Sequence, residues 1–332
     1  MSSNSLPIDL VTGGAGFIGS HLVEHLLSAG REVWVVDDLS TGRESNLDHA
    51  RRLGADRIHF VHSDLEEWLD AEGRSRSFDH VYHLAAAVGV KLVVEDPIGT
   101  IETNIHQTSA ILRFVQDTST PMLMASTSEV YGKGVRDRFC EDDDLLLGPT
   151  SRSRWSYACS KAIDEYLALA HHAQLGIPIS IARFFNTVGP RQVGDYGMVL
   201  PRFVERALSD EPIEVFGDGT QSRCFCDVRD VVQVLPKMLL SDECTGQVMN
   251  VGNDSPITIN DLALLVRSVL GSHSKLVHVP YEEAYSPGFE DLQARVPNLD
   301  RIQNALGFTP TIQLEQTIRD LAIELQRIGG VR

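Results

Sequence analysis

The chain has 332 residues, of which 42% are hydrophobic and 23% charged, and its formal net charge is −17. This length suffices for one large domain or two coupled domains with a sizeable core. The acidic balance disfavours nucleic acid and anionic membrane surfaces as partners. No apolar run approaches the roughly 18 residues that a membrane-spanning helix requires, and the N-terminus lacks the basic region of a signal peptide. We therefore expect a cytoplasmic protein with no membrane or nucleic-acid partner.

The cysteines predict neither a disulfide framework nor a metal site. Five of them are scattered along the chain, at positions 140, 159, 224, 226 and 244. Cys224 and Cys226 are close enough to suggest a metal, but no second ligand pair accompanies them. We expect these two cysteines to alternate along one strand.

The first elements predict a dinucleotide-binding unit. An apolar strand at residues 8–11 leads into Gly13, Gly16 and Gly19, and a helical pattern runs over residues 20–29. The first glycine permits a tight turn, the second lets backbone approach a pyrophosphate, and the third lets the helix pack on the strand. The phosphates would lie at the helix N-terminus.

The end of the second strand indicates which dinucleotide binds. A buried strand at residues 33–36 ends in Asp37 and Asp38, and Asp37 lies 18 residues after Gly19. A carboxylate here binds the adenosine ribose diol and repels a 2′-phosphate, so we expect NAD rather than NADP. Asp38 is an alternative for this role, and a solvated acid at a strand end is the alternative for Asp37.

The rest of the first half predicts a doubly wound parallel sheet of Rossmann type. Further strands are expected at residues 57–61, 80–84, 121–126 and 177–183, with helices at residues 100–116 and 157–173. Ligands bind at the C-terminal edge of such a sheet. There the fifth strand delivers Thr127, Ser128 and Glu129. The acidic segment at residues 139–153 predicts a solvated surface loop.

Tyr157 and Lys161 predict acid–base chemistry. They are four residues apart, so a helix places both side chains on one face, a turn apart. An ammonium beside a phenol lowers the phenol's pKa by favouring the phenolate. A tyrosine prepared in this way acts as a general base near neutral pH. Taken alone, the pair is also compatible with an ordinary amphipathic helix.

The alternation of strand and helix ends near residue 184. Helices are expected at residues 199–207, 261–270, 298–306 and 314–326, and strands near residues 213–216 and 246–252. We expect a NAD-binding domain over residues 1–184, to which segments near 224–252 return. Residues 185–332 would form most of a smaller, interleaved C-terminal substrate-binding domain, with the site in the cleft between the two.

The glycine loop, the upstream hydroxyl and the Tyr-x-x-x-Lys pair together resemble the short-chain dehydrogenase/reductase superfamily. Longer stretches resemble its extended branch, which acts on nucleotide-diphosphate sugars. These stretches are residues 12–20, 126–132, 185–191 and 216–223, and the resemblance covers about residues 8–325.

The resemblance implies a set of NAD-binding residues. They are Gly13, Gly16, Phe17, Ile18, Gly19, Asp37, Asp38, Asp64, Leu65, Leu84, Ala85, Ala86, Tyr157 and Lys161. In the superfamily, an aspartate matching Asp64 meets the adenine amino group, and a helix N-cap is the alternative. The loop at residues 88–97, with Lys91 and Glu95, would reach over the nicotinamide and the substrate.

The resemblance also implies a UDP-sugar site. The expected contacts are Ser128, Asn186, Val199, Leu200, Phe203, Phe216, Arg223 and Arg295. Asn186 and the two arginines would bind the diphosphate or the sugar, because arginine offers forked donors to phosphate oxygens. The apolar members would flank the uracil, with core packing as the alternative.

The catalytic residues that the resemblance implies are Thr127, Glu129, Tyr157, Lys161 and Arg223. In this branch the tyrosine takes the proton of the sugar 4-hydroxyl while a hydride passes from C4 to NAD. The 4,6-dehydratases carry an aspartate where Ser128 stands, and 4-epimerases usually carry a small residue where Glu129 stands. Decarboxylases of UDP-glucuronate carry Thr-Ser-Glu, as this chain does.

The chain therefore resembles most closely the UDP-glucuronate decarboxylases, which form UDP-xylose or a UDP-4-keto-pentose. A 4-epimerase of UDP-glucose or UDP-glucuronate is the alternative, and a non-catalytic NAD-binding protein is a third hypothesis. Glu129 could also be a strand-end carboxylate that holds a loop. Related enzymes pair the helices matching residues 100–116 and 157–173 across a two-fold axis, so the resemblance implies a homodimer with a four-helix bundle.

Overall fold

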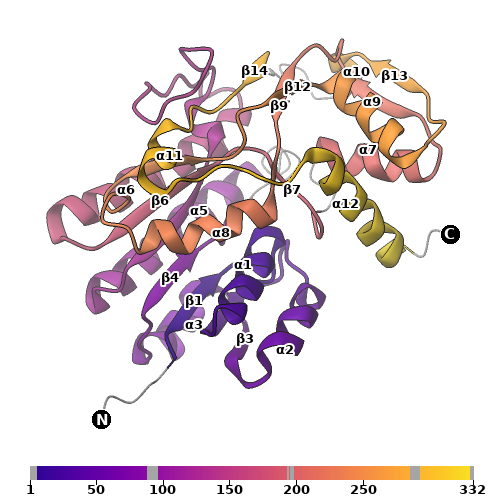
Figure 1. Cartoon of the computed structure of the whole chain (residues 1–332). Coiled ribbons are helices and arrows are strands. Elements are labelled where there is room, and N and C mark those ends of the chain that lie inside the picture. The colour runs from indigo at the N-terminus through magenta and orange to yellow at the C-terminus, as the bar shows by residue number, and fades with distance from the viewer. Residues whose placement is uncertain (1–5, 88–95, 193, 195–197, 285–291, 330–332) are drawn as a thin grey trace.

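A computed structural model describes residues 6–87, 96–192, 194, 198–284 and 292–329. A seven-stranded sheet runs through its centre in the order β11-β6-β5-β4-β1-β2-β3 (Figure 1). Each neighbouring pair is parallel. The strands are β1 (Ile8–Thr12), β2 (Glu32–Asp37), β3 (Ile58–His62), β4 (His80–His83), β5 (Met122–Thr127), β6 (Ile179–Phe184) and β11 (Val248–Val251). The predicted α/β fold of Rossmann type is confirmed.

Helices cover both faces of this sheet because its strands are apolar on both sides. Successive residues of one strand enter different cores: Leu10 belongs to the core under α3 and α5, and Val11 to the core under α1 and α8. The first face carries α1 (Phe17–Ser28), α2 (Asp48–Gly54) and α8 (Val228–Leu239). The second face carries α3 (Leu65–Ala71), α5 (Pro97–Thr118) and α6 (Arg154–Leu175).

Three helices begin earlier than the sequence pattern predicts. α1 begins at Phe17, so Gly19 lies inside it. α5 begins after Asp96, whose carboxylate accepts a hydrogen bond from the Gly99 amide at 3.0 Å. α6 begins at Arg154. Apolar periodicity marks only the turns that pack on the core, so it misses first turns that face a ligand site.

The second half adds small sheets and helices. Its helices are α7 (Val199–Leu208), α9 (Ile259–Leu270), α10 (Tyr281–Ala284), α11 (Asp300–Leu306) and α12 (Leu314–Gly329). β8 (Ile213–Phe216) pairs with β13 (Leu276–Val279). Figure 1 shows α7, α9, α10 and β13 gathered in the upper right of the view, whereas α11 lies at the left. A third apolar core lies between α7, α9 and α12. Because α11 packs on β11 of the main sheet, the two halves are interleaved.

Cys224 and Cys226 lie on two different strands rather than alternating along one. β9 (Ser222–Cys224) lies between β12 (Pro256–Thr258) and β14 (Ala294–Arg295), whereas β10 (Cys226–Asp227) pairs with β7 (Thr187–Val188). Both thiols are buried, and burial raises the pKa of Cys224 to about 12. Within the described residues, no cluster of His, Cys, Asp and Glu could hold a metal ion.

The acidic segment at residues 139–153 is not simply a solvated loop. Glu141 is only 8% exposed, and its carboxylate accepts a hydrogen bond from the Asn250 amide of β11 at 2.9 Å. The Asn250 side chain donates to the Phe139 carbonyl at 2.9 Å. The segment therefore packs on the end of the sheet, which the run of acidic residues alone does not reveal.

Among the described residues, every helix is too short or too polar to span a lipid bilayer.

Loss of one partner of the buried ion pair between Glu165 and Arg183 should strongly destabilise the protein. Arg183 donates to both carboxylate oxygens, at 2.9 and 2.6 Å, and the side chains are 6% and 5% exposed. Glu165→Gln leaves a buried guanidinium without its counter-ion, so we expect the free energy of unfolding to fall by about 3 kcal/mol. Urea denaturation followed by circular dichroism measures this change.

The matched control is Glu66→Gln, which removes an ion pair with Arg113 on the surface. The Arg113 side chain is 54% exposed and the Glu66 side chain 46% exposed. It should change the free energy of unfolding by less than about 1 kcal/mol. Equal effects of the two substitutions would contradict the role of burial.

Candidate active site

A cavity of about 660 Å³ lies along the C-terminal edge of the main sheet and extends to α7 and β8. It brings together nearly every residue that the sequence singles out. The predicted residues on its wall are Gly13, Gly16, Phe17, Ile18, Gly19, Asp37, Asp38, Leu65, Leu84, Ala85, Ala86, Thr127, Ser128, Glu129, Tyr157, Lys161, Asn186, Val199, Leu200, Phe203, Phe216, Arg223 and Arg295. Asp64 is the exception.

The cofactor end of the cavity is a cradle made by backbone. Gly13 has a φ of +69° and lies against the segment after β4, where an added Cβ would come within 2.7 Å of the Ala85 nitrogen. A Cβ on Gly19 would come within 2.1 Å of the Gly13 oxygen. The N-terminus of α1 therefore opens directly onto the cavity with no side chain in between. This shape suits a pyrophosphate, so the residues present fit a dinucleotide.

Asp37 stabilises this cradle. One oxygen of its carboxylate accepts from the Ala15 amide at 2.9 Å, and the other accepts from the Leu39 amide at 2.9 Å. Burial raises the pKa of Asp37, with a further contribution from Asp38, while these amides oppose the shift. Asp38 lies beside it on the cavity wall, so the structure keeps both aspartates as candidates for the ribose diol.

Asp64 is the N-cap of α3, which is the alternative that the sequence analysis gave for it. Its side chain accepts hydrogen bonds from the amides of Glu66 and Glu67 at the start of α3, at 2.8 and 3.2 Å. Its neighbours Ser63 and Leu65 line the cavity, but Asp64 does not. The contact with adenine is therefore not supported by this arrangement. Lys91 and Glu95 lie outside the described residues.

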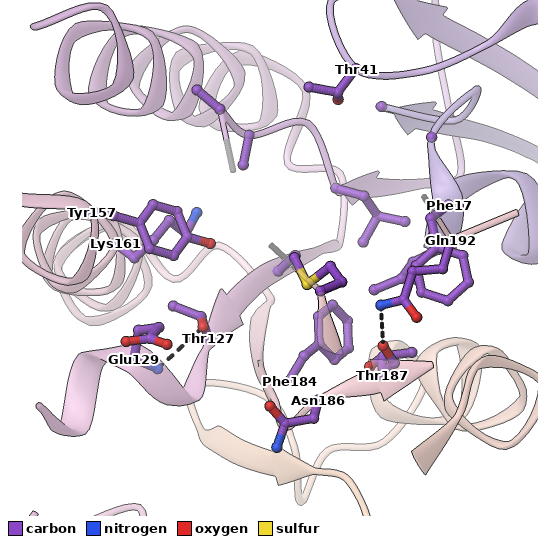
Figure 2. Close-up of a pocket in the computed structure, with 18 of the residues that line it drawn as sticks. Phe17, Thr41, Thr127, Glu129, Tyr157, Lys161, Phe184, Asn186, Thr187 and Gln192 are labelled. Carbon is purple, nitrogen blue, oxygen red and sulfur yellow. Dashed lines mark hydrogen bonds between the residues drawn. The ribbon is translucent and has the colours of Figure 1, made fainter. Parts of the chain in front are cut away.

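The catalytic end joins the end of β5 to the first turns of α6. Figure 2 shows Tyr157 and Lys161 projecting together from α6, with Thr127 and Glu129 facing them. The Thr127 hydroxyl accepts a hydrogen bond from the Glu129 amide at 3.2 Å, which begins the short 3₁₀ helix η4 (Ser128–Tyr131). The helix spacing thus places the predicted phenol and ammonium on one face, as expected.

Two arginines hold the Glu129 carboxylate. Arg295 Nη1 donates to one oxygen at 2.6 Å, and Arg154 Nη2 lies 3.7 Å from the other. Burial would raise the pKa of Glu129, but the guanidiniums of Arg295 and Arg154 outweigh burial and hold the pKa below its ordinary value. Glu129 is therefore ionised at neutral pH in this arrangement.

The pKa of Tyr157 is raised rather than lowered in this arrangement, and a lowering effect of Lys161 on the phenol stays a prediction. Burial raises the pKa of Tyr157, and the negative charge of Glu129 raises it further, against a hydrogen bond with Thr127. The Lys161 ammonium instead donates to the Asp164 carboxylate at 2.9 Å, with side chains 3% and 0% exposed. The sequence pattern identifies the pair but does not reveal the carboxylate that opposes it.

Arg223 lies on the cavity wall, its charge also lowers the pKa of Glu129, and two of its hydrogen bonds go to backbone. Its Nη1 donates to the Ser222 and Leu292 carbonyls at 2.7 and 2.9 Å. Arg295, predicted as a substrate contact, makes the direct contact with Glu129. A catalytic role for Arg223 stays a prediction, and the geometry offers Arg295 for the position next to Glu129.

The far end of the cavity is apolar and partly buried in the second half. Leu200 and Phe203 of α7 are 0% and 2% exposed, so they belong chiefly to the core. Phe216 lies on the wall with the Arg202 guanidinium 4.2 Å from its ring centre. Asn186 has a φ of +34° and donates to the Cys224 carbonyl at 2.9 Å. Its side chain is thereby fixed at the junction of the two halves.

Sequence reasoning missed several residues on the wall. Arg154 precedes Tyr157 by one helical turn, and this spacing was the signal that could have identified it. Gln192 comes from the loop after β7 and lines the same cavity as Phe17 (Figure 2). Its amide nitrogen donates to the Thr187 carbonyl at 3.1 Å. No local pattern reveals Gln192, because its place on the wall depends on the contact between the halves.

The chain is similar to a known family of NAD-dependent enzymes and to two decarboxylases of UDP-uronates. The model of the NAD dependent epimerase/dehydratase family matches residues 10–252. The UDP-N-acetyl-alpha-D-glucosaminuronate decarboxylase of Bacillus cytotoxicus is 38% identical over 94% of this chain and 95% of its own length. The UDP-glucuronic acid decarboxylase 4 of Arabidopsis thaliana is 34% identical over 97% of this chain and 69% of its own length.

A solved structure agrees in fold over nearly the whole molecule. It is the UDP-glucuronic acid 4-epimerase of Bacillus cereus, in complex with UDP-4-deoxy-4-fluoro-glucuronic acid and NAD. The similarity covers 97% of this chain and 99% of that chain, with a TM-score of 0.84 and 26% identity. The prediction of NAD as the cofactor is confirmed by the family and by this neighbour. The glycine cradle, the pair on α6 and these matches lead to one conclusion: the chain belongs to the NAD dependent epimerase/dehydratase family.

Proposed function

We propose that this protein is a NAD-dependent decarboxylase of a UDP-hexuronate, with UDP-glucuronate as the first candidate. The observation that carries the proposal is the position of Glu129 between Arg295 and Arg154, at the catalytic end of the cavity with Tyr157. A pair of guanidiniums in a buried site suits a carboxylate on the substrate. Two relatives named as decarboxylases of UDP-uronates support the same class of reaction.

The first step is removal of the proton from the sugar 4-hydroxyl by Tyr157. Thr127, which shares a hydrogen bond with the phenol, is placed to bind the same sugar oxygen. NAD, when bound, accepts the hydride from C4 and is able to return it. Tyr157 must be ionised to act as a base, and the cationic nicotinamide ring of bound NAD would favour its phenolate.

The second step is loss of the C6 carboxylate from the oxidised sugar. A ketone at C4 makes the substrate a β-keto acid, so the C5–C6 bond breaks, carbon dioxide leaves, and the electron pair passes into an enolate. Arg295 and Arg154 stabilise that negative charge, and a proton must then add to C5. Because the lowered pKa of Glu129 keeps this carboxylate ionised, Glu129 is better suited to orienting the arginines than to donating the proton. The product is UDP-xylose if hydride returns, or a UDP-4-keto-pentose if the ketone leaves.

A 4-epimerase is the second candidate function, and the neighbour solved with a UDP-glucuronic acid analogue supports it. An epimerase shares the first step and then returns hydride to the other face of the sugar. The substituent at C2 is also open, since one relative is named for an N-acetylated uronate and the other for glucuronate.

We also propose that the protein forms a homodimer through α5 and α6. Ile163 and Tyr166 lie one turn apart on α6 and are 38% and 69% exposed, and Ile98 of α5 is 69% exposed. An apolar stripe on paired helices suits a four-helix bundle. Light scattering at micromolar concentration should give the mass of a dimer, and Tyr166→Glu should shift it to that of a monomer. A cytoplasmic location stays a prediction.

Mass spectrometry of the product tests the proposed reaction. With NAD and UDP-glucuronate, we expect a product that has lost carbon dioxide, and its mass separates the pentose from the keto-pentose. UDP-N-acetylglucosaminuronate in a parallel reaction tests the C2 substituent. An unchanged mass with a new retention time would instead establish a 4-epimerase.

Substitution of the arginine tests the site itself. Arg295→Gln removes a charge that stabilises the enolate, so we expect kcat for carbon dioxide release to fall by about 10² to 10³-fold. NAD affinity, measured by quenching of protein fluorescence, should stay within about twofold, because Arg295 lies at the sugar end. Arg113→Gln, on the exposed surface of α5, is the matched control. Unchanged carbon dioxide release in Arg295→Gln would remove this arginine from the mechanism.

A further inference from the structure

Asp164 lies one turn beyond the catalytic lysine and contacts it directly. Its Oδ2 accepts a hydrogen bond from Lys161 Nζ at 2.9 Å, and the side chains are 0% and 3% exposed. Asp164 does not line the cavity, whereas Lys161 does. The carboxylate is therefore positioned behind the ammonium, on the side away from the ligands.

Lys161 is the cation that acts on Asp164, because the other charged groups around this pair are negative, neutral or already paired. On α6 the next acid, Glu165, already binds Arg183. Burial raises the pKa of Asp164, while Lys161 and Thr108 of α5 oppose this shift. From β4 comes His83, whose ring lies 3.4 Å from the Thr108 hydroxyl. Burial, with a smaller effect of the Lys161 charge, lowers the pKa of His83 to about 3, so this imidazole is neutral. From η4, Glu129 adds a negative charge on the far side of Tyr157.

We propose that Asp164 is a positioning residue for proton abstraction: its carboxylate fixes the Lys161 ammonium, offsets its charge, and so sets the pH above which Tyr157 acts as a base. Two opposite charges in contact largely cancel at the distance of a third group. A Tyr-x-x-x-Lys pair with this carboxylate behind it therefore favours the phenolate less than the lysine alone would.

The raised pKa of Tyr157 agrees with this proposal. Burial is the largest cause, Glu129 follows, and Asp164 also raises it. A buried ammonium needs a counter-ion, so Asp164 also stabilises Lys161 while the site holds no ligand. A purely structural counter-ion would affect stability only. The positioning role requires in addition that the titration of Tyr157 depends on Asp164.

Asp164→Asn separates these two roles, because it keeps the shape of the side chain and removes its charge. The ultraviolet absorbance of ionised phenols is titrated in the NAD-free protein, and the curve of a Tyr157→Phe counterpart is subtracted in each background. We expect the Tyr157 titration to move to lower pH by about one unit or more. An unchanged titration, or a shift to higher pH, would overturn the proposal.

The pH profile of turnover gives a second readout, and it rests on the proposed function, whereas the titration does not. Turnover needs the ionised phenol, so it rises with pH through the pKa of Tyr157. In Asp164→Asn this rise should begin about one unit lower, which is roughly a tenfold higher kcat/KM on the acidic side. A shifted titration without any turnover would refute the decarboxylase and leave the role of Asp164 standing.

Controls distinguish charge from folding. Asp230→Asn removes a buried carboxylate that binds Thr311 and Ile312 and does not line the cavity, so it should lower stability and leave the Tyr157 titration unchanged. Asp164→Glu keeps the charge and should keep the wild-type titration. Asp164→Ser is a second neutral variant and should reproduce the shift. If neither neutral variant folds, Asp164 is a structural residue and the proposal fails.

Discussion

The contact between Glu129 and Arg295 joins two segments that lie 166 residues apart in the chain. Glu129 follows the strand that delivers Thr127, and Arg295 belongs to β14 in the second half. Both residues of this ion pair line the cavity, so the contact fixes the Arg295 guanidinium on the cavity wall beside Glu129. The other contacts of the second half, such as Asn250 with the acidic segment, support the same alignment.

The charged groups of this site influence one another's pKa. The chain is acidic overall, with a net charge of −17, yet arginines gather around Glu129. Glu129 and Asp164 both disfavour the phenolate of Tyr157, while Lys161 is held by Asp164. Without ligands the base is therefore kept protonated.

The fold could be predicted well from the sequence because its signals are local. The glycine loop, the alternation of apolar strands with helices, and the spacing of Tyr157 and Lys161 each depend on neighbours in the chain. The same reasoning failed where a second partner decides the outcome. Cys224 and Cys226 belong to different sheets, and Glu141 is buried by β11.

By itself, the sequence determined that this protein has a Rossmann-type sheet, a dinucleotide cradle and a tyrosine–lysine pair at the C-terminal edge of that sheet. Only the tertiary structure decided which arginines meet Glu129, that Gln192 lines the cavity, and that Asp164 binds Lys161. The physical reason is that backbone geometry and apolar periodicity are encoded over a few residues. The pKa of a buried group instead depends on the charges nearest in space, whichever segments supply them.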